Sequence, residues 1–334
     1  MKILAYSHRS DETKFFEKFS KKYNIEILLT DKEPTMETAD LARGIDCISI
    51  ITTKIPENLL KKFKDNGVKF ISTRTIGYDH IDIKKAKEFG IHVGNVNYST
   101  DSVADYTIMM MLMATRKIKL IMEKSNIQDF SLGEVQGKEL HNLTVGVIGT
   151  GKIGKTVIKH LRGFECNILA YDLYENDEVK NLKPFNDNVQ IKYTDFDNLI
   201  KNSDIITMHM PANEENYHMI NKKTISKMKD NVFIINTARG ALINTEDLIE
   251  GIENKKIGGV ALDVIENEAG LYYNDLKGKI LDNKDLAILK SFPNVIVTPH
   301  TAFYTDQAVS DMVENSIKSC IAFLNNEENP WQII

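Results

Sequence analysis

The sequence lacks the features that mark membrane-spanning, metal-binding and nucleic-acid-binding proteins. Its longest uncharged apolar stretch, residues 106–115, is too short to cross a bilayer. It has no long basic run, and its net charge of −5 favours neither nucleic acid nor an anionic membrane as a partner. Neither Cys-x-x-Cys nor His-Glu-x-x-His occurs, so we expect no metal site.

Cysteine is also scarce. The three cysteines, Cys47, Cys166 and Cys320, are odd in number and far apart, which predicts reduced, partly buried thiols rather than a disulfide framework. Charged residues appear as early as His8 and Arg9, too soon for a secretory signal peptide. Together these features predict a cytoplasmic protein.

The chain is long enough, at 334 residues, to form two domains. Short apolar runs alternate with helix-like segments, which predicts parallel sheets covered by helices. The predicted strands are 3–6, 25–29, 47–51, 69–72 and 92–93, then 145–148, 168–171, 205–208, 232–235, 259–262 and 295–297. A long helix is expected over residues 101–123, and a final amphipathic helix over residues 305–324.

This alternation predicts an α/β fold with two doubly wound, Rossmann-like parallel-sheet domains and an active-site cleft between them. We expect a discontinuous substrate-binding domain from residues 1–100 and 300–334, because the last helix can return to the first sheet. Residues 101–299 would then form a dinucleotide-binding domain.

The strongest motif is Gly149-Thr-Gly151-Lys-Ile-Gly154. It follows an apolar run, opens a helix-like stretch, and is followed by a second apolar run that ends on Asp172. Gly149 permits a tight turn, Gly151 lets the backbone approach a pyrophosphate, and Gly154 lets the helix pack closely on the sheet. Asp172 is placed to accept hydrogen bonds from ribose hydroxyls, and its charge favours NAD over NADP.

Three further segments each follow a strand-like run. Arg239 has a planar guanidinium that suits a carboxylate, although a surface ion pair is an alternative. The acids between Asp263 and Glu268 could instead cap a helix or lie in solvent. His300, placed by Pro299, suits a proton donor, although a lone histidine is often structural. Together they supply a carboxylate clamp, a proton source and an acid that stabilises a charged histidine, as hydride transfer to a ketone requires.

These segments together resemble the D-isomer-specific 2-hydroxyacid dehydrogenases over nearly the whole chain. The resemblance is carried by residues 145–154, Asn236-Thr-Ala-Arg239-Gly240, Ala261-Leu-Asp263-Val-Ile-Glu266-Asn-Glu268 and Pro299-His300-Thr-Ala-Phe-Tyr. The chain is most similar to the D-lactate dehydrogenase branch, which includes the vancomycin-resistance type. Pointers to this branch are residues 72–82, 98–105 and 270–294, and His300-Thr-Ala-Phe303-Tyr304.

The resemblance implies a set of site residues. Arg239 would bind the substrate carboxylate, His300 would donate the proton, and Glu268 rather than Glu266 would pair with His300. Substrate contacts are implied for the backbone N–H groups of Ile76 and Gly77, for Tyr98, and for Phe303 as an apolar wall. The residues implied to contact NAD are Gly149, Gly151, Lys152, Ile153, Gly154, Asp172, Met210, Pro211, Asn216, Thr237, Ala238 and Asp263.

The expected function is therefore that of an NAD-dependent D-lactate dehydrogenase, an oxidoreductase that reduces pyruvate to D-lactate. The main alternative is a related enzyme acting on larger 2-oxo acids such as 2-oxoisocaproate or phenylpyruvate. Residues 50–54 belong to the pocket wall in this family, and here they lack the aromatic residue that many D-lactate enzymes have. The side-chain preference of the substrate is thus open.

Other interpretations are weaker. Tyr273-x-x-x-Lys277 is reminiscent of short-chain dehydrogenases, but it lies in a polar, loop-like stretch. Glycerate, phosphoglycerate or formate chemistry, and a nicotinamide-sensing binding protein on the same fold, are further alternatives.

The family resemblance also predicts a homodimer, with the methionine-rich segment 106–113 as a plausible interface.

Overall fold

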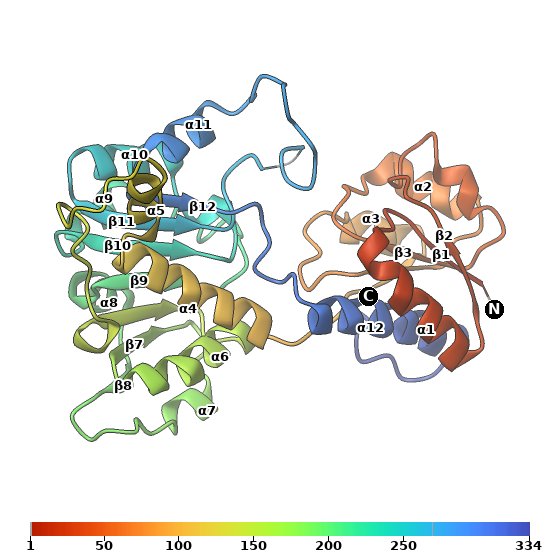
Figure 1. Cartoon of the computed structure of the whole chain (residues 1–334). Coiled ribbons are helices and arrows are strands. Elements are labelled where there is room, and N and C mark those ends of the chain that lie inside the picture. The colour runs from red at the N-terminus through yellow and green to blue at the C-terminus, as the bar shows by residue number, and fades with distance from the viewer. Residues whose placement is uncertain (1, 269) are drawn as a thin grey trace. The chain divides into compact units, whose positions relative to one another are not determined.

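The computed structural model describes residues 2–268 and 270–334, which form two compact units. The first unit comprises Met1–Ser99 and Tyr304–Ile334, and the second comprises Thr100–Phe303. Figure 1 labels most of their helices and strands. Each unit contains one sheet in which every pairing is parallel, so the predicted α/β class with two parallel-sheet domains is confirmed.

The first unit is built on a five-stranded sheet of order β2-β1-β3-β4-β5. Its strands are β1 (Lys2–Ala5), β2 (Glu26–Leu29), β3 (Cys47–Ile50), β4 (Phe70–Thr73) and β5 (His92–Gly94). Its helices are α1 (Thr13–Tyr23), α2 (Glu57–Asp65), α3 (Ile83–Glu88) and α12 (Asp306–Leu324), with the 3₁₀ turns η1 (Ser10–Glu12) and η2 (Ala39–Ala42). The central strands β3 and β4 are buried along their whole length, as expected for strands covered by helices on both faces.

Helix α12 is part of the first unit although it comes from the far end of the sequence. Its N-cap is Thr305, whose hydroxyl accepts a hydrogen bond from the N–H of Ala308 at 3.2 Å. Its buried face includes Val313, Ile317 and Cys320, which join a core cluster with aromatic residues of α1 and β4. Burial of this apolar face against the sheet holds the returning chain in the first unit.

The second unit is built on a seven-stranded sheet of order β12-β11-β10-β9-β6-β7-β8. Its strands are β6 (Thr144–Ile148), β7 (Asn167–Tyr171), β8 (Ile191–Tyr193), β9 (Ile205–Met208), β10 (Val232–Asn236), β11 (Ile257–Leu262) and β12 (Val295–Val297). Its helices are α4 (Asp101–Thr115), α5 (Ile118–Asn126), α6 (Lys152–Leu161), α7 (Asp177–Lys180), α8 (Phe196–Asn202), α9 (Lys222–Lys227), α10 (Thr245–Glu253) and α11 (Lys284–Ser291). The 3₁₀ turns are η3 (Leu140–Asn142), η4 (Arg162–Phe164) and η5 (Gly240–Leu242).

Two apolar clusters cover the two faces of this sheet. One contains buried residues of α4 and α6, and the other contains buried residues of α8, α9, α10 and α11.

Strand β8 was not predicted, because a three-residue Ile-Lys-Tyr edge strand carries no clear apolar pattern. The single helix predicted over residues 101–123 was wrong. Lys117 adopts a left-handed backbone (φ 52°), and the carbonyl of Thr115 accepts instead from the N–H of Lys138 at 3.0 Å, so the chain bends between α4 and α5.

The strand order of the second unit determines where its functional loops lie. The chain runs outward from β6 to β8 and then resumes at β9 on the other side of β6. Ligands of such sheets bind beyond the carboxyl ends of the strands, near this reversal of order. The loops after β12, β11, β10, β9, β6 and β7 follow one another along that edge of the sheet.

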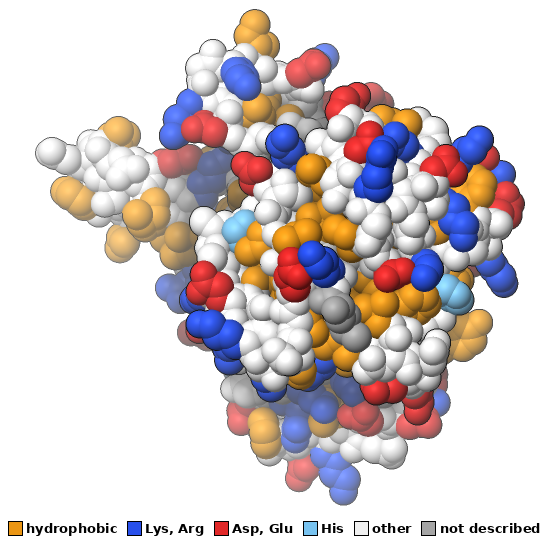
Figure 2. Space-filling model, turned by 90° about the vertical axis from the view of Figure 1, so that its right-hand side faces the viewer, with side chains coloured by type: hydrophobic (Ala, Val, Ile, Leu, Met, Phe, Trp, Pro, Cys, Tyr) orange, Lys and Arg blue, Asp and Glu red, His pale blue; other side chains and the backbone are white. Residues whose placement is uncertain are grey.

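The surface carries charges of both signs, and the cysteines form no disulfide, as the composition predicts. Acidic and basic side chains are mixed over the face shown in Figure 2. All three cysteines are free and buried, and burial raises the pKa of Cys166 to about 11, so that thiol is unreactive. Among the described residues, no helix is long and apolar enough to span a membrane, and no group of three or more His, Cys, Asp or Glu side chains could hold a metal ion.

Candidate active site

The loops after β11 and β12 bring together the predicted acid and the predicted proton donor. His300 Nδ1 lies 2.8 Å from Glu268 Oε1, and each side chain is 29% exposed. The other Glu268 oxygen accepts from the N–H of Ile265 at 3.1 Å, which fixes the carboxylate. An ionised carboxylate only accepts hydrogen bonds, so Nδ1 carries the proton. This contact fixes the orientation of the imidazole ring and leaves Nε2 as the nitrogen that can exchange a proton with a substrate.

The backbone of His300 is held in an unfavourable conformation. Its φ of 55° lies in the left-handed region, which costs a residue with a Cβ about 1–2 kcal/mol. Its N–H donates to the carbonyl of Asp263 at 2.8 Å, and its carbonyl accepts from the hydroxyl of Tyr273 at 2.8 Å. Tyr273 lies in a turn rather than in the helix that a short-chain dehydrogenase would have there.

The buried Asp263 carboxylate organises the same loop. Its oxygens accept from the hydroxyl of Thr298 at 2.6 Å, the N–H of Thr301 at 2.9 Å and the N–H of Ala302 at 2.9 Å. These three donors flank His300 on both sides in the sequence. The structure therefore gives Asp263 a role that sequence reasoning missed, and its contact with the cofactor stays a prediction.

Arg239 follows β10, the strand next to β11. Its side chain is half-buried, and Nη1 donates to the carbonyl of Ala238 at 2.8 Å. The Asn236 side chain braces the turn, because it donates to the carbonyl of Arg239 at 2.9 Å and accepts from the N–H of Ala238 at 2.9 Å. A Cβ on Gly240 would lie 2.1 Å from the carbonyl carbon of Ile265, so the loops after β10 and β11 are in direct backbone contact.

The glycine-rich loop has the open cradle that a pyrophosphate needs. Gly149 has φ 89°, and a Cβ on Gly154 would lie 1.9 Å from the carbonyl oxygen of Gly149. A Cβ on Gly151 would meet nothing within 4 Å, so space remains at the start of α6. Gly151 is the N-cap of α6 and has no side chain to occupy the helix N-terminus, where backbone N–H groups favour an anion.

Asp172 is suited to accept a hydrogen bond from a ribose hydroxyl of a dinucleotide. One carboxylate oxygen accepts from the N–H and the hydroxyl of Thr150 at 2.6 and 3.0 Å, and the other accepts from the N–H of Tyr174 at 3.0 Å. A carboxylate offers about four acceptor positions, so it retains capacity for a ribose hydroxyl. The residues present thus fit NAD.

The loop after β9 lies next to the glycine-rich loop and carries Met210, Pro211 and Asn216. Asn216 closes this loop by donating to the carbonyl of Pro211 at 2.8 Å and accepting from the N–H of Asn213 at 2.7 Å.

Sequence reasoning missed His209, although it stands directly after a strand. Its carbonyl would be 2.7 Å from a Cβ on Gly149, and burial lowers the pKa of its ring to about 3, so the ring is neutral.

The substrate-binding candidates of the first unit lie after β4 and β5. The Asn95 side chain donates to the carbonyl of Ile76 at 2.8 Å, and the hydroxyl of Thr75 donates to the carbonyl of Gly77 at 2.6 Å. Tyr98 is half-buried in the segment after β5. Phe303, the last residue of the second unit, is also half-buried.

Sequence reasoning also missed Arg74, which begins the loop that carries Ile76 and Gly77. Arg74 and Glu12 are both fully buried, and Arg74 Nε donates to Glu12 Oε1 at 2.9 Å. The same guanidinium donates to the hydroxyl of Ser49 and to the carbonyl of Tyr6, each at 2.9 Å. This network satisfies a buried charge and anchors the loop. A charged pair 62 positions apart gives no signal in the sequence.

The doubly wound sheet, the open glycine cradle and the acid after β7 define a dinucleotide-binding protein of the NAD-dependent oxidoreductase class. The model of the family described as "D-isomer specific 2-hydroxyacid dehydrogenase, NAD binding domain" matches residues 108–302. The chain belongs to the D-isomer-specific 2-hydroxyacid dehydrogenase family, and its cofactor is NAD.

Relatives of known name match nearly the whole chain. An aromatic 2-oxoacid reductase of Clostridium sporogenes is 46% identical over 97% of this chain and 96% of its own length. A D-lactate dehydrogenase of Lactiplantibacillus plantarum is 38% identical over 100% of this chain and 99% of its own. The structure of D-lactate dehydrogenase with NAD+ from Lactobacillus jensenii matches with a TM-score of 0.85 and 32% identity, covering 100% of each chain.

Proposed function

We propose that the chain reduces the keto group of a 2-oxo acid to the D-2-hydroxy acid, with His300 as the proton donor. The observation that carries this proposal is the 2.8 Å contact between His300 Nδ1 and Glu268, on a loop that Asp263 holds in place. In this proposal the second unit binds NAD, and the first unit binds substrate through Ile76, Gly77 and Tyr98.

The roles of the side chains follow from their chemistry. When bound, NADH supplies the hydride. Arg239 would hold the substrate carboxylate through its planar pair of donors and draw electron density from the keto oxygen. His300 Nε2 would give its proton to that oxygen, while Glu268 holds the ring through Nδ1. In the reverse direction His300 would accept the proton.

The NAD contacts proposed for this chain lie on five loops. The peptide N–H groups of Lys152, Ile153 and Gly154 at the start of α6 would bind the pyrophosphate, and Asp172 would bind the ribose. Further contacts are proposed from Met210, Pro211 and Asn216 after β9, from Thr237 and Ala238 after β10, and from Asp263 after β11.

Among substrates, we favour a 2-oxo acid with a large apolar side chain, and pyruvate is the second candidate. Residues 50–54, the expected pocket wall, include no aromatic side chain, so we propose that this wall accepts a larger substrate side chain. The 46% identity to an aromatic 2-oxoacid reductase points the same way. The relative named D-lactate dehydrogenase supports pyruvate, the substrate that the sequence predicted.

The substrate panel tests the proposed function directly. NADH oxidation would be measured with pyruvate, 2-oxobutyrate, 2-oxoisocaproate, phenylpyruvate and hydroxypyruvate, and the product resolved by chiral chromatography. We expect the highest kcat/KM on phenylpyruvate or 2-oxoisocaproate, and a D-product. A preference for pyruvate would select the D-lactate alternative, and absence of turnover with every acid would contradict the proposed reaction.

The substitution Arg239→Lys tests the carboxylate clamp. Lysine keeps the charge but loses the two-point geometry, so KM for the 2-oxo acid should rise roughly tenfold or more, with a smaller change in KM for NADH. Steady-state kinetics with each substrate varied in turn measure both constants. Arg162→Lys is the matched control, because Arg162 lies over the ring of Phe185 at 4.2 Å. An unchanged KM for the acid would remove Arg239 from this role.

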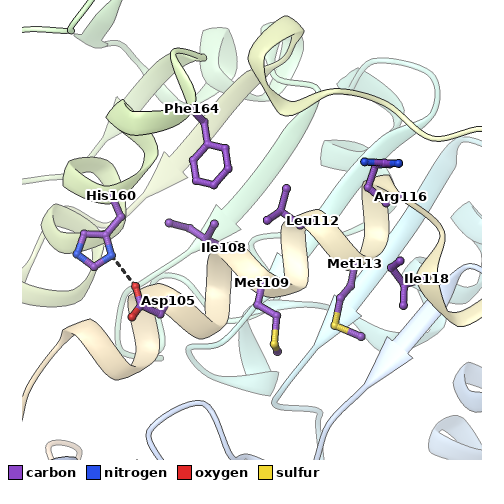
Figure 3. Close-up of a pocket in the computed structure, with 9 residues that line it drawn as sticks. All are labelled: Asp105, Ile108, Met109, Leu112, Met113, Arg116, Ile118, His160 and Phe164. Carbon is purple, nitrogen blue, oxygen red and sulfur yellow. Dashed lines mark ion pairs between the residues drawn. The ribbon is translucent and has the colours of Figure 1, made fainter.

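We also propose that the chain forms a homodimer through the groove drawn in Figure 3. The groove has a volume of about 730 Å³ and lies along α4, with Ile108, Met109, Leu112 and Met113 in its lining and Phe164 on the opposite side. Asp105 and His160 form an ion pair at one end, and Arg116 stands at the other. A two-fold axis would place the acidic end of one copy against the basic end of the other.

A charge in the groove should prevent this association. Met109 is 39% exposed, so Met109→Glu should leave the fold intact but place a carboxylate in the apolar contact. Sedimentation velocity should show a dimer for the wild type and a monomer for the variant. Leu41→Glu, at an exposed apolar position of the first unit, is the control and should remain dimeric. A monomeric wild type would refute the proposal.

A further inference from the structure

A second histidine–glutamate pair lies at the same edge of the sheet of the second unit, outside the proposed trio. His218 Nε2 is 2.5 Å from Glu266 Oε1, and their side chains are 24% and 18% exposed. The other Glu266 oxygen accepts from the N–H and the hydroxyl of Thr245 at 3.0 and 2.7 Å. Burial alone would raise the pKa of Glu266, but the hydrogen bonds from His218 and Thr245 outweigh it and lower the pKa.

The polarity of these hydrogen bonds is determined by their neighbours. The Asn244 oxygen accepts from the N–H of Asp247 at 3.0 Å, so its amide nitrogen faces His218 Nδ1 at 3.2 Å. Nδ1 is therefore the acceptor, and Nε2–H donates to Glu266. The ring of Tyr217 stacks on His218 at 3.8 Å and restricts its rotation.

This pair connects three loops that carry site residues. His218 belongs to the loop after β9, and its N–H donates to the carbonyl of Ala241 in the turn after Arg239 at 2.9 Å. Glu266 belongs to the loop after β11, whose Ile265–Glu266 peptide packs against Gly240 with no space for a Cβ. The loops of the cofactor candidates, of Arg239 and of Glu268 are thus joined at one point.

The pair also lies close in the sequence to Glu268. Only Asn267 separates Glu266 from Glu268, and Asn267 adopts a left-handed backbone with φ 56°. Such a turn keeps its geometry only when the residues around it are fixed. Release of Glu266 would let the turn relax and move the Glu268 carboxylate away from His300 Nδ1. A displacement of about 1 Å is enough to lower catalysis roughly 100-fold.

We infer that His218 and Glu266 are positioning residues that hold Arg239 and Glu268 at a fixed spacing for reduction of the 2-oxo acid. This inference rests on the proposed function. The pair does not touch the reacting atoms. It acts through Gly240 on Arg239, and through Asn267 on Glu268 and hence on His300.

The test combines Glu266→Gln with Asn244→Asp. In Glu266→Gln the amide oxygen can still accept from Thr245, but the amide nitrogen then faces Nε2–H, and two donors meet. Adding Asn244→Asp gives Nδ1–H a carboxylate acceptor, so the ring can reverse its tautomer and Nε2 can accept from the new amide. Aspartate also remains a good N-cap for α10.

We expect Glu266→Gln to lower kcat at least tenfold and to raise KM for the 2-oxo acid several-fold. The dissociation constant for NADH, measured by fluorescence titration, should stay within about threefold of the wild type. The double variant should recover to within about threefold in kcat. Glu250→Gln is the control, because it removes an exposed carboxylate that pairs with Lys222 at 2.7 Å, and it should leave every constant unchanged.

The outcomes separate this inference from the proposed function. If the wild type reduces a 2-oxo acid and Glu266→Gln keeps kcat and KM within twofold, the inference is overturned alone. Failure of the double variant to recover would also overturn it. A wild type inactive on the whole acid panel overturns both. If Glu266→Gln does not fold, His218→Phe removes the donor to Glu266 while keeping a ring beside Tyr217, and it must show the same losses.

Discussion

Replacement of His300 by alanine is expected to lower kcat for 2-oxo acid reduction roughly 100- to 10,000-fold, the usual contribution of a positioned proton donor. NADH binding should change little, because His300 stands at the β12 end of the sheet while the glycine loop and Asp172 follow β6 and β7. Steady-state rates and fluorescence titration with NADH measure the two effects separately. Retained turnover would refute the proton-donor role.

The substitution Glu268→Gln tests the partner of His300, and it should lower kcat less than His300→Ala does. The amide oxygen is a weaker acceptor for Nδ1–H than the carboxylate, so the ring is held less firmly and kcat for reduction should fall. Glu266→Gln should not reproduce the full loss, because Glu266 contacts His218 rather than His300. A flat response to Glu268→Gln would leave His300 without its proposed acid partner.

The second large effect is expected at Asp263, a buried residue that sequence reasoning placed with the cofactor. In Asp263→Asn an amide nitrogen replaces one of the two oxygens that accept from Thr298, Thr301 and Ala302. At least one buried donor then loses its acceptor, which should lower the free energy of unfolding by about 2 kcal/mol. The left-handed turn at His300 loses its support, so kcat should also fall roughly 100-fold.

Urea denaturation and initial rates measure the two consequences for Asp263→Asn. Thr298→Val is the matched control, since it removes one hydrogen bond to the same carboxylate and leaves both backbone N–H donors in place. Its loss of stability should be about 1 kcal/mol, and its kcat should fall much less than that of Asp263→Asn. Equal activity losses in the two variants would argue against a special role for the carboxylate.

Much of the second unit could be predicted because its signals are local. A buried parallel strand is a short apolar run, and a pyrophosphate loop requires glycines at fixed spacing before a helix. Gly149, Gly154 and Asp172 therefore stood out before any contact was known. The pairing of His300 with Glu268 rather than Glu266 came from family resemblance, and the structure shows that contact.

The parts that escaped prediction depend on contacts between distant residues. Arg74 meets Glu12 across 62 positions, and His218 meets Glu266 across 48. Charged and polar residues have no periodicity that reveals a buried partner, and solvated side chains of the same types are far more common. The bend at Lys117 was missed for a related reason, because Lys138 supplies the hydrogen bond that replaces helix continuation.

The sequence by itself determined most of the order of strands and helices, the glycine turn before α6 and the identity of the reactive groups, because apolar periodicity and backbone freedom are properties of neighbouring residues. Only the tertiary structure decided that Asp263 supports the loop around His300 and that Glu266 belongs to His218. Hydrogen bonds depend on distance and direction in space, and those are fixed only once the parallel strands align their carboxyl ends at one edge.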